Sequence, residues 1–292
     1  MTDLDSRSYA DFELARWRGF FRRVLESLSG HRRELLSYEE VKEKLRLGGP
    51  VYQGLHSVPL KEIIGSVNRY RDFDRLFFPT QSHTQDRWRR INRAWYQEIG
   101  LPPILLYKVG EAYFVIDGNH RVSVARSKGQ IYIDAEVREC SSRVPLTAGI
   151  EPEGLERLGE RVDFLERTRL DELRPQAQVE TTVLGGYDRM IEHIAVHRYF
   201  LGIESDREVS DAASVKSWYD TLYAPVVAVV ENSGVLEHFP GRTAADLYLW
   251  VMDHLHYLRG HPGQEGLDPV SAAKDFVEGI AEESRDERDD PS

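Results

Sequence analysis

Two short apolar segments, residues 104–109 and 112–116, are separated only by Gly110 and Glu111. Both are rich in the β-branched, aromatic and aliphatic residues that favour strands. A two-residue connection that contains Gly is typical of a tight β-turn, because glycine tolerates the backbone angles that such turns need. The pattern predicts an antiparallel hairpin, and the chain has to build a sheet around it.

The hairpin is followed directly by the segment Asp117-Gly118-Asn119-His120-Arg121. Residues 120–128 then have a helical pattern, and Gly129 is placed to be the left-handed residue that ends that helix. Residues 131–137 alternate apolar and polar side chains, as a third strand would. The sequence therefore predicts a short helix carried between strands of one small sheet.

The chain before the hairpin is predicted to begin with a helix over residues 9–28 and a second over 37–47, with Ser37 as its N-cap. Residues 58–60 read as extended and 61–65 as a brief turn or helix. Apolar side chains at Trp88, Ile91, Trp95 and Ile99 predict one face of a helix over 86–99.

The second half of the chain is predicted to be mainly helical. Helical spacing of apolar residues appears around residues 155–165, 187–201, 210–230 and 243–259, whereas 179–183 reads as a lone strand. We expect an α+β chain with a small mixed sheet and four parts: an N-terminal helical extension (1–50), a sheet module (51–148), a mainly helical acidic domain (149–281) and a disordered acidic tail (282–292).

Composition limits the classes of protein that fit this chain. Its 292 residues are 41% hydrophobic and carry a net charge of −11, so the whole surface is a poor match for a polyanion. Residues 1–100 are the exception, with 18 Lys and Arg against 14 Asp and Glu. The single cysteine, Cys140, excludes an internal disulfide, and no segment reads as a signal peptide or membrane span, so we expect a cytoplasmic protein.

The segment around Gly118 has the chemistry of an anion site. A helix start presents unpaired backbone N–H groups and the positive end of the helix dipole. Gly118 lets the backbone turn sharply, and His120 and Arg121 add donors suited to phosphate oxygens. Asn119 or Asp117 is expected to cap the helix, and Asp117 is alternatively a magnesium ligand or a partner for a sugar hydroxyl. An ordinary capped helix is the competing interpretation.

The segment from Phe114 to Ala125, with Gly118, His120, Arg121 and Ala125 in place, resembles the phosphate-binding box of ParB-like proteins and sulfiredoxins. The resemblance covers residues 51–144, about a third of the chain. It implies a nucleotide, with CTP, ATP or ADP as the candidates, accompanied by magnesium. It also implies that Asp117, Gly118, Asn119, His120 and Arg121 form the binding box.

The chain departs from that family in two respects. Sulfiredoxins have a reactive cysteine just before the His-Arg pair, and Asn119 occupies that position here. Cys140, at the end of a predicted strand, is expected to be a packing residue. ParB proteins carry a DNA-reading helix-turn-helix after the box, and the acidic second half does not look like one, so DNA segregation is not expected.

A polar loop before the arginine-rich helix supplies further candidates. Arg69 and Arg71 are expected to reach phosphate, and Glu62, Asp72 and Asp74 are candidate catalytic bases or metal ligands. The alternative is a loop packed by its aromatic residues, with its charges in solvent. The sequence leaves both open.

Clustered arginines in the first half suggest a second interpretation. They lie at Arg16, Arg18, Arg22 and Arg23, at Arg32 and Arg33, and at Arg87, Arg89, Arg90 and Arg93. Such clusters are typical of nucleic-acid contacts, although a solvated helix face produces the same pattern. The alternative function is therefore a DNA- or RNA-binding regulator or a ParB-like nuclease.

The second half contains two histidine pairs, His193 with His197 and His254 with His256. Facing helices are able to build a metal site from such pairs, but the surrounding aromatic residues favour hydrogen-bonded histidines in a core, and we assign no metal. Residues 192–201 and 244–258 also resemble an uncharacterised helical bacterial domain. The overall hypothesis is a nucleotide-binding protein, acting in phosphotransfer or NTP hydrolysis or as a nucleotide-gated regulator; a homodimer stays open.

Overall fold

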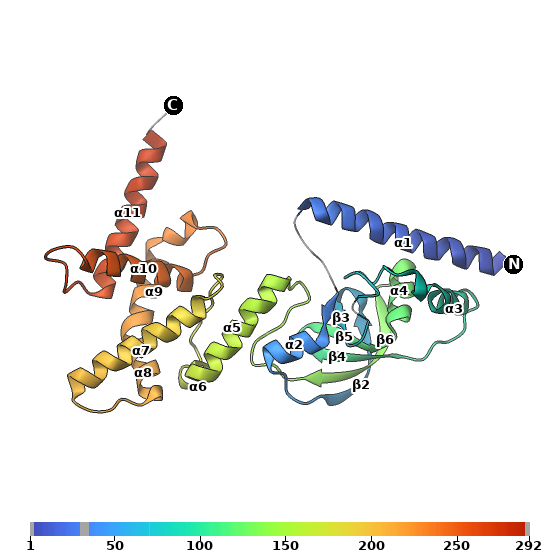
Figure 1. Cartoon of the computed structure of the whole chain (residues 1–292), viewed down its shortest axis with the longest axis horizontal. Coiled ribbons are helices and arrows are strands. Elements are labelled where there is room, and N and C mark those ends of the chain that lie inside the picture. The colour runs from blue at the N-terminus through green and yellow to red at the C-terminus, as the bar shows by residue number, and fades with distance from the viewer. Residues whose placement is uncertain (1–2, 30–34, 70, 290–292) are drawn as a thin grey trace. The chain divides into compact units, whose positions relative to one another are not determined.

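The computed structural model describes residues 3–29, 35–69 and 71–289, without the side chains of 21–29 and 283–289. The chain divides into two compact units, residues 1–155 and 156–292. The first unit holds the sheet and the second is helical (Figure 1). None of the described helices is long and apolar enough to cross a bilayer.

The first unit is built on a six-stranded mixed sheet with the order β1-β3-β5-β4-β6-β2. Its strands are β1 (Leu36–Ser37), β2 (Val51–Pro59), β3 (Ile63–Ser66), β4 (Ile104–Val109), β5 (Ala112–Asp117) and β6 (Tyr132–Cys140). The predicted hairpin of β4 and β5 is confirmed as an antiparallel pair, and β6 lies parallel to β4 on its other side. The α+β class predicted from the sequence is thereby confirmed.

Three helices build up one end of this unit. They are α1 (Asp3–Ser29), α3 (Gln85–Tyr96) and α4 (Asn119–Ser127), with short 3₁₀ turns η1 (Leu60–Glu62) and η2 (Ser82–Thr84) in the connections. Phe12 of α1 and Trp88 of α3 pack with Val124 of α4 in one apolar cluster. Trp88 Nε1 also donates to Ser123 Oγ at 2.9 Å, which holds α3 against α4.

The N-terminal residues are part of this unit and do not form a separate extension. β1 pairs with β3, and α2 (Tyr38–Leu45) follows it with Tyr38, Val41 and Leu45 buried. Ser37 is the N-cap of α2 as predicted, but its side chain makes no capping hydrogen bond, since the residue already belongs to β1. The unit ends after Leu155, rather than at residue 148.

Some predicted elements were wrong. Of the turn or helix predicted for 61–65, only residues 60–62 form a 3₁₀ turn, η1. Residues 63–66 form β3, which was missed because a strand buried on both faces shows no alternation. Residues 179–183 form no strand, since they pair with no described neighbour. The helix predicted over 86–99 ends at Tyr96, so Ile99 lies beyond α3. Of the predicted apolar face, Trp88 is buried, whereas Trp95 and Ile99 are 38% and 55% exposed.

The second unit packs helices around a core of aromatic residues. Its elements are α5 (Pro152–Thr168), α6 (Leu170–Leu173), α7 (Gly186–Ser205), α8 (Asp211–Trp218), the π-helical turn η3 (Tyr219–Tyr223), α9 (Ala224–Ser233), η4 (Val235–His238), α10 (Ala244–Arg259) and α11 (Pro269–Asp289). Trp218, Tyr223 and Tyr248 lie against one another in its centre. The mainly helical second half is as predicted.

The acidic tail predicted for residues 282–292 continues α11 as far as Asp289. Glu and Arg are good helix formers, so a charged segment extends an existing helix at little cost. The last three residues lie outside the described part of the chain.

Candidate functional site

The turn between β5 and α4 depends on Gly118. Its backbone has φ 113° and ψ 15°, in the left-handed region that side chains disfavour. A Cβ atom at this position would lie 2.4 Å from Cγ2 of Ile104 and 2.8 Å from its Cβ. The predicted need for glycine is confirmed, and it brings the backbone close to β4 at the point where the helix starts.

The helix start has no side-chain cap, contrary to the prediction for Asn119 or Asp117. Gly118 itself is the N-cap residue, and it has no side chain to offer. Asp117 is turned toward Arg121 instead, with 2.5 Å between carboxylate and guanidinium. Among the described residues, no side chain accepts from the backbone N–H groups of the first turn, which leaves them available to an anion.

Arg121 is held by the protein. Its guanidinium donates to the carbonyl oxygens of Pro102 and Pro103, to the latter at 2.9 Å, as well as to Asp117. Its side chain is only 12% exposed. Arg121 therefore fixes the loop before β4 against the start of α4, and it adds positive charge to the site without presenting a free fork of donors.

His120 is buried in the same turn, with 4% of the residue exposed. Its ring meets the edge of Phe73, at 5.3 Å between ring centroids. Neither ring nitrogen has a hydrogen-bond partner, and the Oδ1 atom of the buried Asn119 also lacks one. Burial, reinforced by Arg87 and Arg69, lowers the pKa of His120 to about 4, so the ring is neutral at pH 7.

These groups line a cleft of about 160 Å³. Its lining includes all five residues of the predicted box, Asp117, Gly118, Asn119, His120 and Arg121. The rest of the lining comes from Ile116, Asn68, Arg69, Arg87 and Ile91. Arg87 was predicted only as part of a nucleic-acid cluster. It reaches this cleft because α3 packs on α4, which no local sequence signal reveals.

The polar loop brings one acid to the edge of the cleft. Arg69 pairs with Asp72 at 3.1 Å, and the other carboxylate oxygen of Asp72 lies 3.5 Å from Nε2 of His83. The side chain of Arg87 is 56% exposed and its guanidinium lies 4.0 Å from Asp117. Three arginines and two aspartates thus surround the cleft, giving it a positive balance.

The other predicted residues of this region do not meet at the cleft. Asp74 accepts the backbone N–H groups of Leu76 and Phe78, at 3.0 and 2.8 Å, and stabilises its own turn. Glu62 and Arg71 are absent from the cleft lining. Of the three predicted catalytic acids, only Asp72 lies near the box.

The arginines of α3 point to different surroundings: two contact α1, one lines the cleft and one is exposed. Arg93 pairs with Asp5 of α1 at 2.7 Å, and Arg89 donates to the carbonyl oxygen of the same residue. Arg87 faces the cleft, which leaves Arg90 exposed. On α1, Arg16 pairs with Glu13. The side chains of Arg22 and Arg23, and the residues Arg32 and Arg33, lie outside the described part of the chain. The described arginines of α3 do not form one continuous basic surface.

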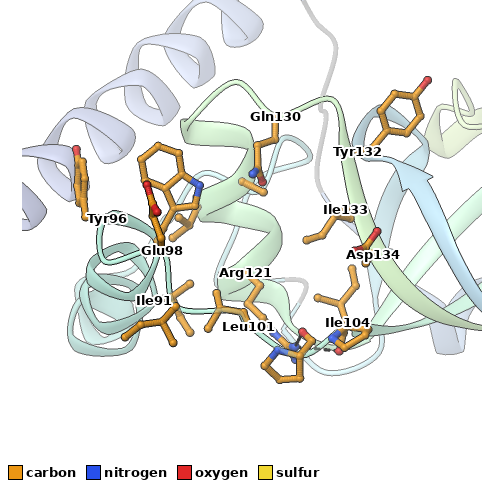
Figure 2. Close-up of a pocket in the computed structure, with 16 residues that line it drawn as sticks. Ile91, Tyr96, Glu98, Leu101, Ile104, Arg121, Gln130, Tyr132, Ile133 and Asp134 are labelled. Atoms are coloured by element: carbon orange, nitrogen blue, oxygen red, sulfur yellow. Dashed lines mark hydrogen bonds between the residues drawn. The ribbon is translucent and has the colours of Figure 1, made fainter.

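A larger pocket of about 720 Å³ adjoins the cleft and shares Ile91 and Arg121 with it. Figure 2 shows side chains of α3 on one side, those of β6 on the other, and α4 between them. Ile91, Leu101, Ile133 and Tyr132 supply apolar and aromatic surface, and Glu98, Gln130 and Asp134 supply polar groups. Such a mixture suits a flat organic group with a polar edge.

Three of the four histidines singled out in the second unit have protein partners. His193 Nδ1 lies 3.2 Å from the hydroxyl of Tyr248, and His197 Nε2 lies 2.9 Å from that of Ser217. His254 pairs with Asp275 at 2.7 Å. Among the described residues, no three His, Cys, Asp or Glu side chains are arranged to hold a metal ion. Cys140 is buried at the end of β6, as predicted, beside the Tyr38 hydroxyl.

No protein-family model matches the chain, and no curated protein does. Among solved structures, the chain is similar to a sulfiredoxin from Arabidopsis thaliana. That match has 20% sequence identity and a TM-score of 0.24, and it covers 30% of this chain and 89% of the sulfiredoxin. The resemblance of the second half to a bacterial helical domain has no support in these comparisons.

Proposed function

We propose that the first unit binds a nucleotide, with its phosphates in the cleft at the start of α4. The observation that carries the proposal is the pair of unpartnered ring nitrogens on the buried His120. Buried polar groups are almost always hydrogen-bonded, and leaving one unsatisfied costs about 1–3 kcal/mol. A phosphate oxygen in the cleft accepts from the single N–H group of the neutral ring and removes the cost of leaving that donor unpaired.

The surroundings of His120 favour an anion over a neutral ligand. The uncapped first turn of α4 points its N–H groups and helix dipole at the cleft. Arg69 and Arg87 line the same cavity, and neither is buried in an internal network as Arg121 is. A phosphate there meets backbone donors and two arginines at once.

The adjoining 720 Å³ pocket favours a nucleotide over inorganic phosphate. Its apolar and aromatic lining is suited to a base, with Gln130, Glu98 and Asp134 able to hydrogen-bond its edge. Arg121 and Ile91 lie at the junction of the two cavities. Which of CTP, ATP and ADP binds, and whether magnesium accompanies it, are parts of the proposal that ligand titration decides.

The arrangement supports a nucleotide-gated regulator better than a phosphotransfer or hydrolytic enzyme. A general base has to lie within hydrogen-bond reach of the group it activates. Glu62 and Asp74 lie away from the cleft, and Asp72 is already paired with Arg69 and His83. Asp72 is therefore the only one of the three predicted acids that is placed to act as a base. If the wild type hydrolyses a nucleotide and Asp72→Asn does so at the same rate, none of the three predicted acids is catalytic.

Calorimetric titration of the full chain tests the binding proposal. Nucleoside mono-, di- and triphosphates are titrated with and without Mg²⁺, beside pyrophosphate and a free nucleoside. We expect a nucleotide to bind more tightly than pyrophosphate or the free nucleoside. We expect Arg87→Ala to lower the affinity for that nucleotide at least tenfold. Arg90→Ala, three residues along the same helix and exposed, is the matched control and leaves affinity unchanged. Equal losses in both variants, or no heat with any nucleotide, would overturn the proposal.

The nucleic-acid alternative makes a different prediction in the same material. Oligonucleotide affinity falls steeply with salt, with a slope set by the number of phosphates neutralised. Under that alternative, Arg90→Ala weakens binding as much as Arg87→Ala does, because both contribute charge to one surface. The split contacts of Arg87, Arg89 and Arg93 favour the nucleotide instead.

A further inference from the structure

The outer face of α7 carries a continuous apolar stripe. Val196, Tyr199, Phe200 and Ile203 are 56%, 66%, 56% and 60% exposed. Their spacing of three, one and three residues places them on one side of the helix. The opposite side holds Tyr187, Met190 and Ile194, which are buried in the second unit, where α7 lies against α8 and α10 (Figure 1). One face therefore builds the core, and the other is apolar without a described partner.

The stripe is symmetric about its own centre. An antiparallel copy of α7, related by a twofold axis between Tyr199 and Phe200, places Tyr199 opposite Phe200 and Val196 opposite Ile203. Every apolar side chain of the stripe then meets another apolar side chain. Twofold interfaces need such self-complementarity, because each surface patch has to match itself.

The charges flanking the stripe obey the same symmetry. Glu192 lies as far before the axis as Arg207 lies after it, so each copy's carboxylate faces the other copy's guanidinium. Both residues are exposed, and Arg207 is kept close to the last turn of α7 by a hydrogen bond from its backbone N–H to the Gly202 carbonyl.

We infer that α7 is a homodimerisation helix, which pairs antiparallel with α7 of a second copy of this chain. The inference is independent of the nucleotide proposal, since it rests on the second unit alone. Exposed apolar stripes of this kind cover a few hundred Å², less than the roughly 800 Å² per partner of standard interfaces. The dimer is accordingly expected to dissociate on dilution within the micromolar range.

Sedimentation velocity of the full chain between about 1 and 200 μM tests first whether the chain dimerises. We expect the mass to rise with concentration from 33.7 kDa toward twice that value. Val196→Asp keeps the chain monomeric throughout. Leu184→Asp, at an apolar residue that is 51% exposed outside the stripe, is the matched control and dimerises like the wild type.

A charge exchange tests the register and does not depend on a disruptive variant. Glu192→Arg and Arg207→Glu each place like charges opposite one another at both ends of the interface. Each single change is expected to weaken dimerisation about tenfold, and the double variant to restore it. A wild-type chain that stays monomeric up to 200 μM, or a double variant as weak as the singles, overturns the inference.

Discussion

Nη2 of Arg121 donates to Oδ2 of Asp117 at 2.5 Å, so the basic residue that the motif offers to a ligand is bound to the acid at the end of β5. The same guanidinium holds the carbonyl oxygens of Pro102 and Pro103. Through these contacts Arg121 has a structural role: it holds the loop before β4 and the end of β5 against the start of α4. The cations that remain accessible to a ligand come from other elements, Arg69 from the polar loop and Arg87 from α3.

Replacing Arg121 with Lys is expected to destabilise the ligand-free protein. A lysine ammonium does not reproduce the planar fork that reaches three acceptors, so the free energy of unfolding falls by about 1–3 kcal/mol. Urea unfolding measures this, with Arg90→Lys as the control, which changes stability by no more than about 0.5 kcal/mol. If Arg121→Lys has the unfolding free energy of the wild type and loses only ligand affinity, then Arg121 contacts the ligand and does not have this structural role.

Gly118→Ala is expected to cost more stability than the same change at Gly129. Both glycines have positive φ, 113° and 73°, but a Cβ at Gly118 meets Ile104 whereas one at Gly129 meets open space. The strained backbone costs about 1 kcal/mol at either site, and overpacking adds about 1–3 kcal/mol at Gly118 alone. Thermal unfolding of the two variants compares them directly. Equal losses would mean that the contact with Ile104 is relieved by a small shift of β4.

The stability of the first unit is expected to fall as the pH drops from about 6.5 toward 4. His120 has a folded pKa near 4, below the value of 6.5 that it recovers on unfolding. The unfolded chain therefore takes up the proton first, and the contribution of the neutral ring, up to about 3 kcal/mol, is lost through this window. Urea unfolding at pH 7 and pH 4.5 measures the loss, which His120→Asn should lack. If His120→Asn loses as much unfolding free energy between pH 7 and pH 4.5 as the wild type does, His120 is not the group responsible for the loss.

Bound phosphate should change the titration of His120. An anion beside the ring favours its charged form, so the pKa of His120 rises when the cleft is filled. NMR of the imidazole carbons, with and without the nucleotide selected by calorimetry, follows this pKa. His193, buried in the second unit and also with a lowered pKa, serves as the internal control. An unchanged His120 titration in the saturated complex places the phosphates elsewhere.

Asp11 is expected to decide whether α1 stays attached to the module. Its Oδ2 accepts from Asn92, Tyr96 and Lys128 at 2.9, 2.8 and 2.7 Å, which joins α1 to α3 and to the end of α4. Removing the carboxylate leaves the largely buried Lys128 uncompensated, so Asp11→Ala should cost about 3 kcal/mol. Hydrogen exchange along α1 should rise with it. Asp3→Ala, whose carboxylate is 82% exposed, provides the control with unchanged protection.

Local patterns were sufficient for the hairpin, for α4 and for its terminal glycines. The turn at Gly118 and the helix end at Gly129 follow from backbone rules that act over a few residues, which makes them readable in one dimension. β3 was missed because its four residues are all buried, so it lacks the alternation that marks a half-exposed strand. The strand predicted for residues 179–183 does not form, because a strand needs a pairing partner and the described part of the chain offers none to this segment.

The sequence by itself determined the β4–β5 hairpin, β6, α4 and the helical second half, since each depends on periodicity or on contacts between near neighbours. Tertiary structure decided which charges serve the box. In the folded chain Arg121 pairs with Asp117, Arg93 pairs with Asp5, and Arg87 lines the cleft. A side chain's partner depends on which elements pack together, and the packing of α1 and α4 on α3 joins residues that lie tens of positions apart in the chain.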